Sequence, residues 1–335
     1  MYYFCTYFDS NFLVTGLSLY RSLQEQCPRF KLWVLCLDDE CFDVLSSGDY
    51  PNLVAVQLSD LESSDLQLAE ARKNRSLIEY YFTCTASFSL YLLRHFKEID
   101  LITYLDADLY FFSDPAPVYE ELMGSSIGII EHRFPESMKK LERYGVYNVG
   151  WVSFRRDEAG LACLELWREQ CIDWCYDRLE AGRFADQKYL DSWPHLFDAV
   201  RVIQHKGANL APWNVARYTV GEKCDLVTVD DQPLIFFHFH GLKKVSGLPL
   251  YNTGLGDNRA VLNSTLRNGV YRHYLAAKLK VSQEFAASDY AVPTQGSVRT
   301  FVNDLWKNPS MRSFSKVLIA IYSLFICRAY LIFRA

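Results

Sequence analysis

The fold of this chain is decided by residues 101–112, LITYLDADLYFF. Two aspartates spaced i and i+2 stand between two apolar runs, so a buried strand delivers both carboxylates at its end. Residues i and i+2 lie on the same side of extended backbone, and Asp106 and Asp108 can therefore share one hard divalent cation. The alternative is a strand-to-turn junction in which the aspartates only accept hydrogen bonds from backbone N–H groups.

Segments typical of strands and of helices alternate on both sides of this stretch. The alternation predicts an α/β fold with a mostly parallel sheet flanked by helices, in which ligands bind at the carboxyl ends of the strands. Besides the strand that carries Asp106, the expected strands are Tyr2–Thr6, Lys31–Leu37, Leu53–Leu58, Ile127–Ile130, Asn148–Phe154, Ala199–Ile203, Leu226–Val229 and Leu234–Phe239. The expected helices are Asn11–Gln26, Asp39–Ser46, Glu79–Phe96 and Glu158–Leu179.

Composition excludes some classes of protein. The 335 residues suit one large domain with appendages. A net charge of −5 argues against a nucleic-acid partner, because such proteins usually carry a basic excess. The ten cysteines include no Cys-x-x-Cys pair, and most stand in apolar segments, so reduced thiols are expected. With no basic region before the first apolar run, no signal peptide is expected, and the chain is predicted to be cytoplasmic.

A second cluster of polar residues lies at 236–244, FFHFHGLKK. If this segment begins as a strand, His238 and His240 lie on one face of it. A neutral imidazole is a good metal ligand and favours Mn²⁺ over Mg²⁺ at an oxygen-rich site. Gly241 allows backbone to approach a phosphate closely, and Lys244 offers a compact cation to a diphosphate. The alternative is a pair of hydrogen-bonded histidines at a strand end.

Taken in order, these motifs resemble the GT-A nucleotide-sugar glycosyltransferases, most closely the retaining enzymes of family 8, over roughly residues 1–250. The resemblance implies a GT-A fold and a metal ion, Mn²⁺ or Mg²⁺, held by Asp106, Asp108 and His238. The chain departs from the family where Val245 and Ser246 replace the usual Pro-Trp after the lysine.

The same resemblance implies residues that bind a nucleotide-diphosphate sugar. Asp9 and Asn11 match the pair that contacts the base, and Asn148-Val149-Gly150 matches an Asn-Ala-Gly turn beside the sugar. The full expected donor-binding set is Thr6, Asp9, Asn11, Arg75, Asn148, Gly150, Gly241 and Lys244. Asp186 and Gln187 match a pair that lines the donor sugar, and they are the expected catalytic residues. The alternative for Asp186 is the N-cap of a helix at Gln187–Ser192.

The expected activity is metal-dependent transfer of a sugar from a nucleotide sugar, a UDP-sugar by resemblance, to a glycan or glycolipid acceptor with retention. Two other classes stay open. A haloacid-dehalogenase-type phosphatase also places Asp-x-Asp after an apolar strand, although Tyr110 stands where that class has Thr or Val. The other alternative is a non-catalytic scaffold that keeps the fold for binding.

Three parts of the chain are expected: a transferase domain at 1–254, a helical extension at 255–312, and an apolar and basic helix at 313–335. The apolar run Val317–Cys327 would span only about 16 Å as a helix, against roughly 30 Å of hydrocarbon. A helix lying in the membrane surface fits better, with a spanning helix or an oligomer contact as alternatives. The prediction is a peripheral protein on the cytoplasmic face of the inner membrane, with a lipid-linked or glycan acceptor and a possible homo-oligomer.

Overall fold

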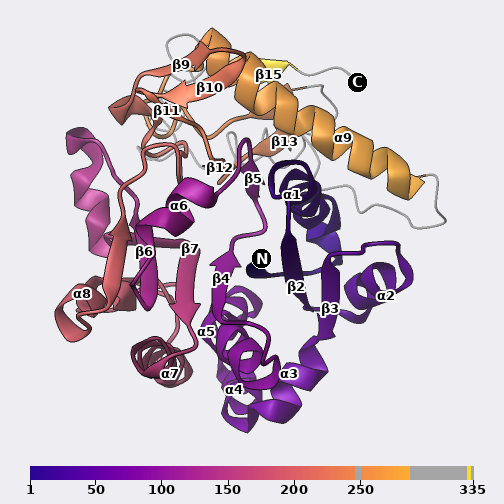
Figure 1. Cartoon of the computed structure of the whole chain (residues 1–335), viewed down its shortest axis with the longest axis vertical. Coiled ribbons are helices and arrows are strands. Elements are labelled where there is room, and N and C mark those ends of the chain that lie inside the picture. The colour runs from indigo at the N-terminus through magenta and orange to yellow at the C-terminus, as the bar shows by residue number, and fades with distance from the viewer. Residues whose placement is uncertain (246–249, 287–329, 333–335) are drawn as a thin grey trace, which may run out of the picture.

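The centre of the molecule is a seven-stranded sheet with strand order β3-β2-β1-β4-β7-β6-β8 (Figure 1). The computed structural model describes residues 1–245, 250–286 and 330–332. All neighbouring strands of the sheet are parallel except where β7 meets β4 and β6, so the predicted α/β fold with a mostly parallel sheet is confirmed. The strands are β1 (Tyr2–Phe8), β2 (Phe30–Cys36), β3 (Leu53–Gln57), β4 (Leu101–Leu105), β6 (Ile127–Glu131), β7 (Tyr147–Arg155) and β8 (Val200–Ile203).

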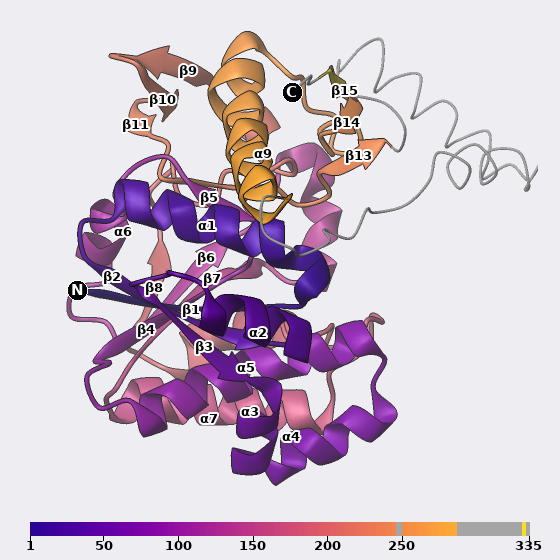
Figure 2. The same ribbon diagram turned by 90° about the vertical axis from the view of Figure 1, so that its right-hand side faces the viewer.

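Helices cover both faces of this sheet. In β2, Leu32 and Val34 join one core while Trp33 and Leu35 join the other, as the two-residue period of a strand requires. The first core packs against α1 (Leu13–Gln26) and α2 (Asp39–Ser47). The second packs against α3 (Leu58–Ser64), α5 (Leu77–His95) and α7 (Glu158–Asp173), and Figure 2 shows α1 and α7 on opposite sides of the sheet. The shorter helices are α4 (Leu66–Ala71), α6 (Ala116–Glu121) and α8 (Trp193–Leu196).

Helix α5 begins two residues earlier than predicted because its N-terminus is capped. The Ser76 backbone N–H donates to the Glu79 carboxylate at 2.8 Å, so this donor is satisfied before the first turn. Buried residues of α5 then run under the sheet and include Thr85, which reaches the functional site.

Two short strands far apart in the sequence form a separate ladder above the sheet. Strand β5 (Leu109–Phe111) pairs antiparallel with β12 (Phe236–His238), and the register places His238 opposite Leu109. This pairing brings the two polar clusters of the sequence together. The remaining small sheets contain β9 (Val220–Lys223), β10 (Leu226–Val229) and β11 (Gln232–Pro233), and β13 (Lys243–Val245), β14 (Leu250–Asn252) and β15 (Tyr330–Ile332).

Residues after 254 pack onto the same body of the molecule. A π-helical segment (Leu266–Arg272) leads into α9 (His273–Ala286), and the ring of Tyr274 stacks on Phe239 at 3.8 Å between centroids. Helix α9 also crosses α1 (Figure 2). There Lys278 donates to the Thr15 hydroxyl at 2.8 Å. The expected domain boundary at residue 254 therefore does not interrupt the packing, because one hydrophobic core contains residues from before and after it.

The predicted helix at 313–335 is wrong at its end. Residues 330–332 form β15, which pairs antiparallel with β14. The rest of 313–335, and residues 287–312 of the expected extension, lie outside the described residues. Among the residues that are described, none of the helices has the length and apolar character needed to cross a membrane.

Candidate functional site

Asp106 and Asp108 follow β4 directly, at the edge of the sheet where parallel strands end. The β5–β12 ladder brings His238 to them: its Nε2 lies 3.0 Å from an oxygen of Asp108 and 3.5 Å from one of Asp106. Backbone bonding fixes this junction, because the Phe239 N–H donates to the Asp108 carbonyl at 3.0 Å. The three residues predicted to hold a metal ion are thus brought together.

His240 also belongs to this cluster. Within the part of the chain that the structure describes, Asp108, His238 and His240 present ligand atoms that all lie within 4.8 Å of one another. The metal prediction named Asp106 but not His240. The His-x-His spacing was the signal for it, because both side chains leave the same face of the segment.

The charges of the cluster are interdependent. Burial raises the pKa of Asp106, and the nearby carboxylate of Asp108 adds to this against the opposing attraction of His238. Burial would also raise the pKa of Asp108, but attraction and hydrogen bonding from His238 lower it. Burial disfavours the charged imidazole, yet Asp108 raises the pKa of His238. A proton on His238 therefore compensates the carboxylates, and a divalent cation can take over that role.

The chemistry of this donor set fits a divalent cation. Two carboxylates and an imidazole suit Mn²⁺ and related ions. The Nδ1 atom of His238 is buried without a hydrogen-bond partner among the described residues, which is uncommon for a structural histidine.

Gly150 makes room for the histidine. A Cβ at this position would lie 2.7 Å from Oδ1 of Asn148 and 2.9 Å from the His238 ring, so only glycine fits. The Gly150 N–H donates to Oδ1 of Asn148 at 3.2 Å, which directs the amide nitrogen toward Gln187 and His132, each 3.5 Å away. The predicted Asn148-Val149-Gly150 turn thus lies against the carboxylate–imidazole cluster.

Asp186 and Gln187 lie in the same region. Thr85 of α5 donates its hydroxyl to the Asp186 carboxylate at 3.0 Å, and Trp167 donates to the Asp186 carbonyl at 2.8 Å. Burial raises the pKa of Asp186 to about 7, with a further contribution from Asp106. The N-cap alternative is wrong, because Gln187 is the residue that precedes the 3₁₀ segment Lys188–Ser192.

Residues from each of these groups line one cavity of about 690 Å³, large enough for a sugar and part of a second molecule. Its wall combines the polar residues described above with aromatic side chains, which offer flat faces to a sugar ring. The lining includes Tyr7, Phe82, Asp106, His132, Phe134, Tyr144, Asn148, Asp186, Gln187, Trp213, His238, His240, Gly241 and Lys243.

Several lining residues were not predicted. Both lysines are exposed, but Lys243 lines the cavity and the predicted Lys244 does not, because alternate residues of β13 face opposite sides. His132 is a further lining residue. It is buried, and desolvation lowers its pKa to about 4, so the imidazole is neutral.

The expected base-contacting residues lie at the carboxyl end of β1. Oδ1 of Asp9 is buried without a partner among the described residues, and Asn11 donates weakly to Oδ2 of Asp9 at 3.4 Å. Thr6 is fully buried and does not line the cavity. A second cavity of about 340 Å³ lies where β2 and β3 end, with Asp38 and Arg72 in its wall.

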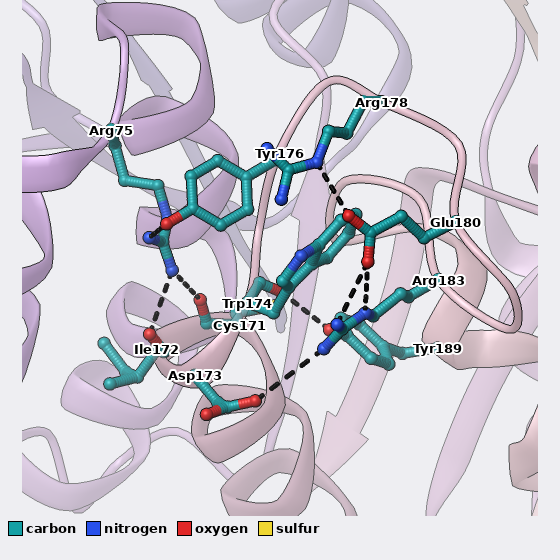
Figure 3. Close-up of polar contacts among 10 residues, drawn as sticks. All are labelled: Arg75, Cys171, Ile172, Asp173, Trp174, Tyr176, Arg178, Glu180, Arg183 and Tyr189. Atoms are coloured by element: carbon teal, nitrogen blue, oxygen red, sulfur yellow. Dashed lines mark hydrogen bonds and ion pairs between the residues drawn. The ribbon is translucent and has the colours of Figure 1, made fainter.

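Arg75 lies away from the cluster. Its guanidinium donates to the Ile172 carbonyl at 3.0 Å and to the Tyr176 hydroxyl at 2.5 Å, and it stacks on the Tyr176 ring at 4.0 Å (Figure 3). Arg75 was predicted among the donor-binding residues, and it is not one of the residues that line the cavity. Its Nη2 donates to carbonyls at the C-terminal end of α7, where a cation is favourable, while its Nε is buried without a partner among the described residues.

Two proteins of Bacillus subtilis (strain 168) are similar to most of this chain. The uncharacterized protein YfnD is 32% identical over 248 residues, which cover 73% of this chain and 79% of YfnD. The uncharacterized protein YfnF is 32% identical over 251 residues, 72% of this chain and 82% of YfnF. This chain belongs to the family of YfnD and YfnF. No family model matches it.

Solved structures that can be superposed on this YfnD relative share less of its sequence. The galactosyltransferase LgtC in complex with donor and acceptor sugar analogues is 16% identical, covers 71% of this chain and 87% of its own, and has a TM-score of 0.48. Mouse xyloside xylosyltransferase 1 is 13% identical, covers 72% and 98%, and has a TM-score of 0.46. Likeness at this level assigns no activity, so the case for a function rests on the residues of the site.

Proposed function

We propose that this protein is a metal-dependent glycosyltransferase that uses a nucleotide-diphosphate sugar. The observation that carries the proposal is that Asp106 and His238 lie in the wall of the 690 Å³ cavity, with Asp108 in contact with His238. Asn148, Asp186 and Gln187 line the same cavity. A cation-binding group beside polar and aromatic walls is suited to a charged diphosphate joined to a sugar.

The residues that would hold the ion are Asp106, Asp108 and His238. When bound, a divalent cation supplies positive charge to a departing diphosphate. Lys243 adds a positive charge to the cavity wall, where it can bind phosphate oxygens. These groups are held in place before substrate arrives, so little reorganisation is needed as negative charge develops.

Polar and aromatic residues beside the cation site would orient the sugar. The amides of Asn148 and Gln187 offer donors and acceptors, and Asp186, with a pKa of about 7, can donate or accept a hydrogen bond near neutral pH. Tyr144 and Phe184, 4.9 Å apart, offer apolar faces against which a sugar ring can pack. Asp186 and Gln187 are therefore proposed as the residues nearest the reacting carbon.

The finer assignments remain part of the proposal. The donor is a UDP-sugar, the acceptor is a glycan or lipid-linked glycan, and the configuration is retained, as the resemblance of the motifs implies. The proposed location is the cytoplasmic face of the inner membrane, reached through 313–335, with a homo-oligomer as a further possibility.

The test is nucleotide release from a panel of nucleotide sugars, with and without Mn²⁺. Slow Mn²⁺-dependent release of nucleoside diphosphate from one donor is expected, because water can replace the acceptor. Release of inorganic phosphate from phosphate esters, with no nucleotide release from any sugar nucleotide, would instead support the phosphatase class. No turnover and no nucleotide binding would contradict both enzymes.

A further inference from the structure

The imidazole of His240 is not needed by the proposed function, yet it lies beside the cation-binding residues. Its ligand atom is within 4.8 Å of those of Asp108 and His238, and the rings of His238 and His240 stand 6.0 Å apart at 84°. Two imidazoles at nearly a right angle, with a carboxylate within reach of both, can converge on one point between them.

The position of His240 is fixed by its surroundings although its side chain is exposed. The Trp213 ring meets both imidazoles edge-on, at 5.0 Å from His238 and 5.6 Å from His240. Gly254, at a φ of +74°, packs against the His240 carbonyl so closely that an added Cβ would lie 3.1 Å from that oxygen. Gly241, at a φ of +75°, turns the chain immediately after the histidine.

We propose that His240 is a second imidazole ligand, so that the site selects a later first-row divalent ion over Mg²⁺. Imidazole nitrogen binds Mn²⁺ and, more tightly, Co²⁺, whereas Mg²⁺ prefers oxygen ligands and retains its waters. The inference rests on the proposed function only in treating this cluster as a cation site. A merely solvated His240 would leave metal affinity unchanged.

The experiment measures metal binding directly, by titration calorimetry with MnCl₂, CoCl₂ and MgCl₂ in the absence of any nucleotide. His240→Ala is expected to weaken Mn²⁺ and Co²⁺ binding by about 10- to 100-fold, with Co²⁺ affected more, while Mg²⁺ binding changes little. His240→Gln, which offers an amide oxygen, should weaken Co²⁺ binding and preserve Mg²⁺ binding. His195→Ala, an exposed histidine of α8, is the matched control and should behave as wild type.

Trp213 provides a second readout. Because Trp213 contacts both imidazoles, Co²⁺ should quench part of the protein fluorescence, and Trp213→Phe should abolish that part. The same quenching should require more Co²⁺ in His240→Ala. Equal Mn²⁺ and Co²⁺ affinities in wild type and His240→Ala would overturn the inference, as would a wild type that binds neither ion.

The two proposals can fail separately. Suppose that nucleotide release depends on Mn²⁺ and that His240→Ala binds metal as wild type does. His240 would then not be a metal ligand, and the proposed transferase activity would stand. The converse outcome is a protein that binds Mn²⁺ and Co²⁺ selectively through His240 and releases no nucleotide from any sugar nucleotide. That result would support the metal site and contradict the proposed transferase activity.

Discussion

Two largely buried carboxylates, Asp65 and Asp186, show how differently the same group is used in this molecule. Arg168 donates to Asp65 from two nitrogens, one at 2.7 Å, and the Leu68 N–H adds a third bond. Burial would raise the pKa of Asp65, but the bonds from Arg168 and Leu68 lower it. Among the described residues, Asp186 has only the Thr85 hydroxyl as a side-chain donor, and burial raises its pKa to about 7.

The contrast distinguishes a structural carboxylate from one available to a ligand. Asp65 joins α4 to α7, and its charge is fully compensated within the protein. Asp106 and Asp108, by contrast, share the single imidazole of His238. Asp106 also accepts a hydrogen bond from the Tyr104 hydroxyl, and both carboxylates keep bonding capacity for a ligand. Uncompensated buried charge lowers stability, and it is retained where function needs it.

Asp65→Ala should have the largest effect, and it should fall on stability. Arg168, with 16% of its side chain exposed, would remain without its carboxylate. The free energy of unfolding should fall by about 3–5 kcal/mol. Urea denaturation measures this, with the exposed Asp43→Ala on α2 expected within about 0.5 kcal/mol of wild type. Activity per folded molecule should not change. A loss of activity without a loss of stability would contradict the assignment of Asp65 as a structural carboxylate.

Asp108→Ala should have the opposite pattern, with a loss of activity and little change in stability. Removing a ligand from the charge-stabilising centre should lower Mn²⁺-dependent nucleotide release at least about 10²-fold, equivalent to roughly 2.7 kcal/mol. The denaturation midpoint should stay near that of wild type, because the remaining His238 can lose its proton. Asp43→Ala again serves as control. Near-wild-type turnover by the Asp108 variant would contradict the metal assignment.

Asp186→Asn tests the contrast between Asp65 and Asp186 through the pH dependence of stability. Between its ordinary pKa near 3.8 and about 7, the folded protein holds a proton on Asp186 that the unfolded chain has lost. Stability of the wild type therefore falls as pH rises through this window. The asparagine variant lacks this loss, so its stability relative to wild type should rise by roughly 2–3 kcal/mol from pH 5 to pH 8.

Urea denaturation of both proteins at several pH values measures that difference. Other titrating groups largely cancel between them, which makes the wild type its own control. A difference that is flat with pH would mean that Asp186 is ionised in the folded protein well below pH 7. In that case Asp186 would belong with Asp65 as a compensated carboxylate.

The sequence predicted well what depends on local pattern. The apolar run of β2 placed that strand within about a residue of its observed ends, because buried parallel strands need largely apolar sequence. The pairing of Asp106 and Asp108 with His238 was also predicted, since each group lies at the end of such a run.

What the sequence did not predict depends on tertiary contacts. Arg75 binds the carbonyl of Ile172, a backbone partner that carries no sequence signal. Lys243 rather than Lys244 reaches the cavity because pairing with β14 sets which face of β13 points inward. Residues 330–332 belong to the apolar stretch that was expected to be a helix, yet they pair as a strand with β14.

The ladder of β5 and β12 has a consequence for how the protein matures. The acidic half of the cluster emerges from the ribosome about 130 positions before His238, so an early nascent chain cannot close the site. A slip of one residue in the ladder would turn Phe237 toward the carboxylates and His238 away from them. Cation uptake by a newly made chain should therefore report correct register of this late pairing.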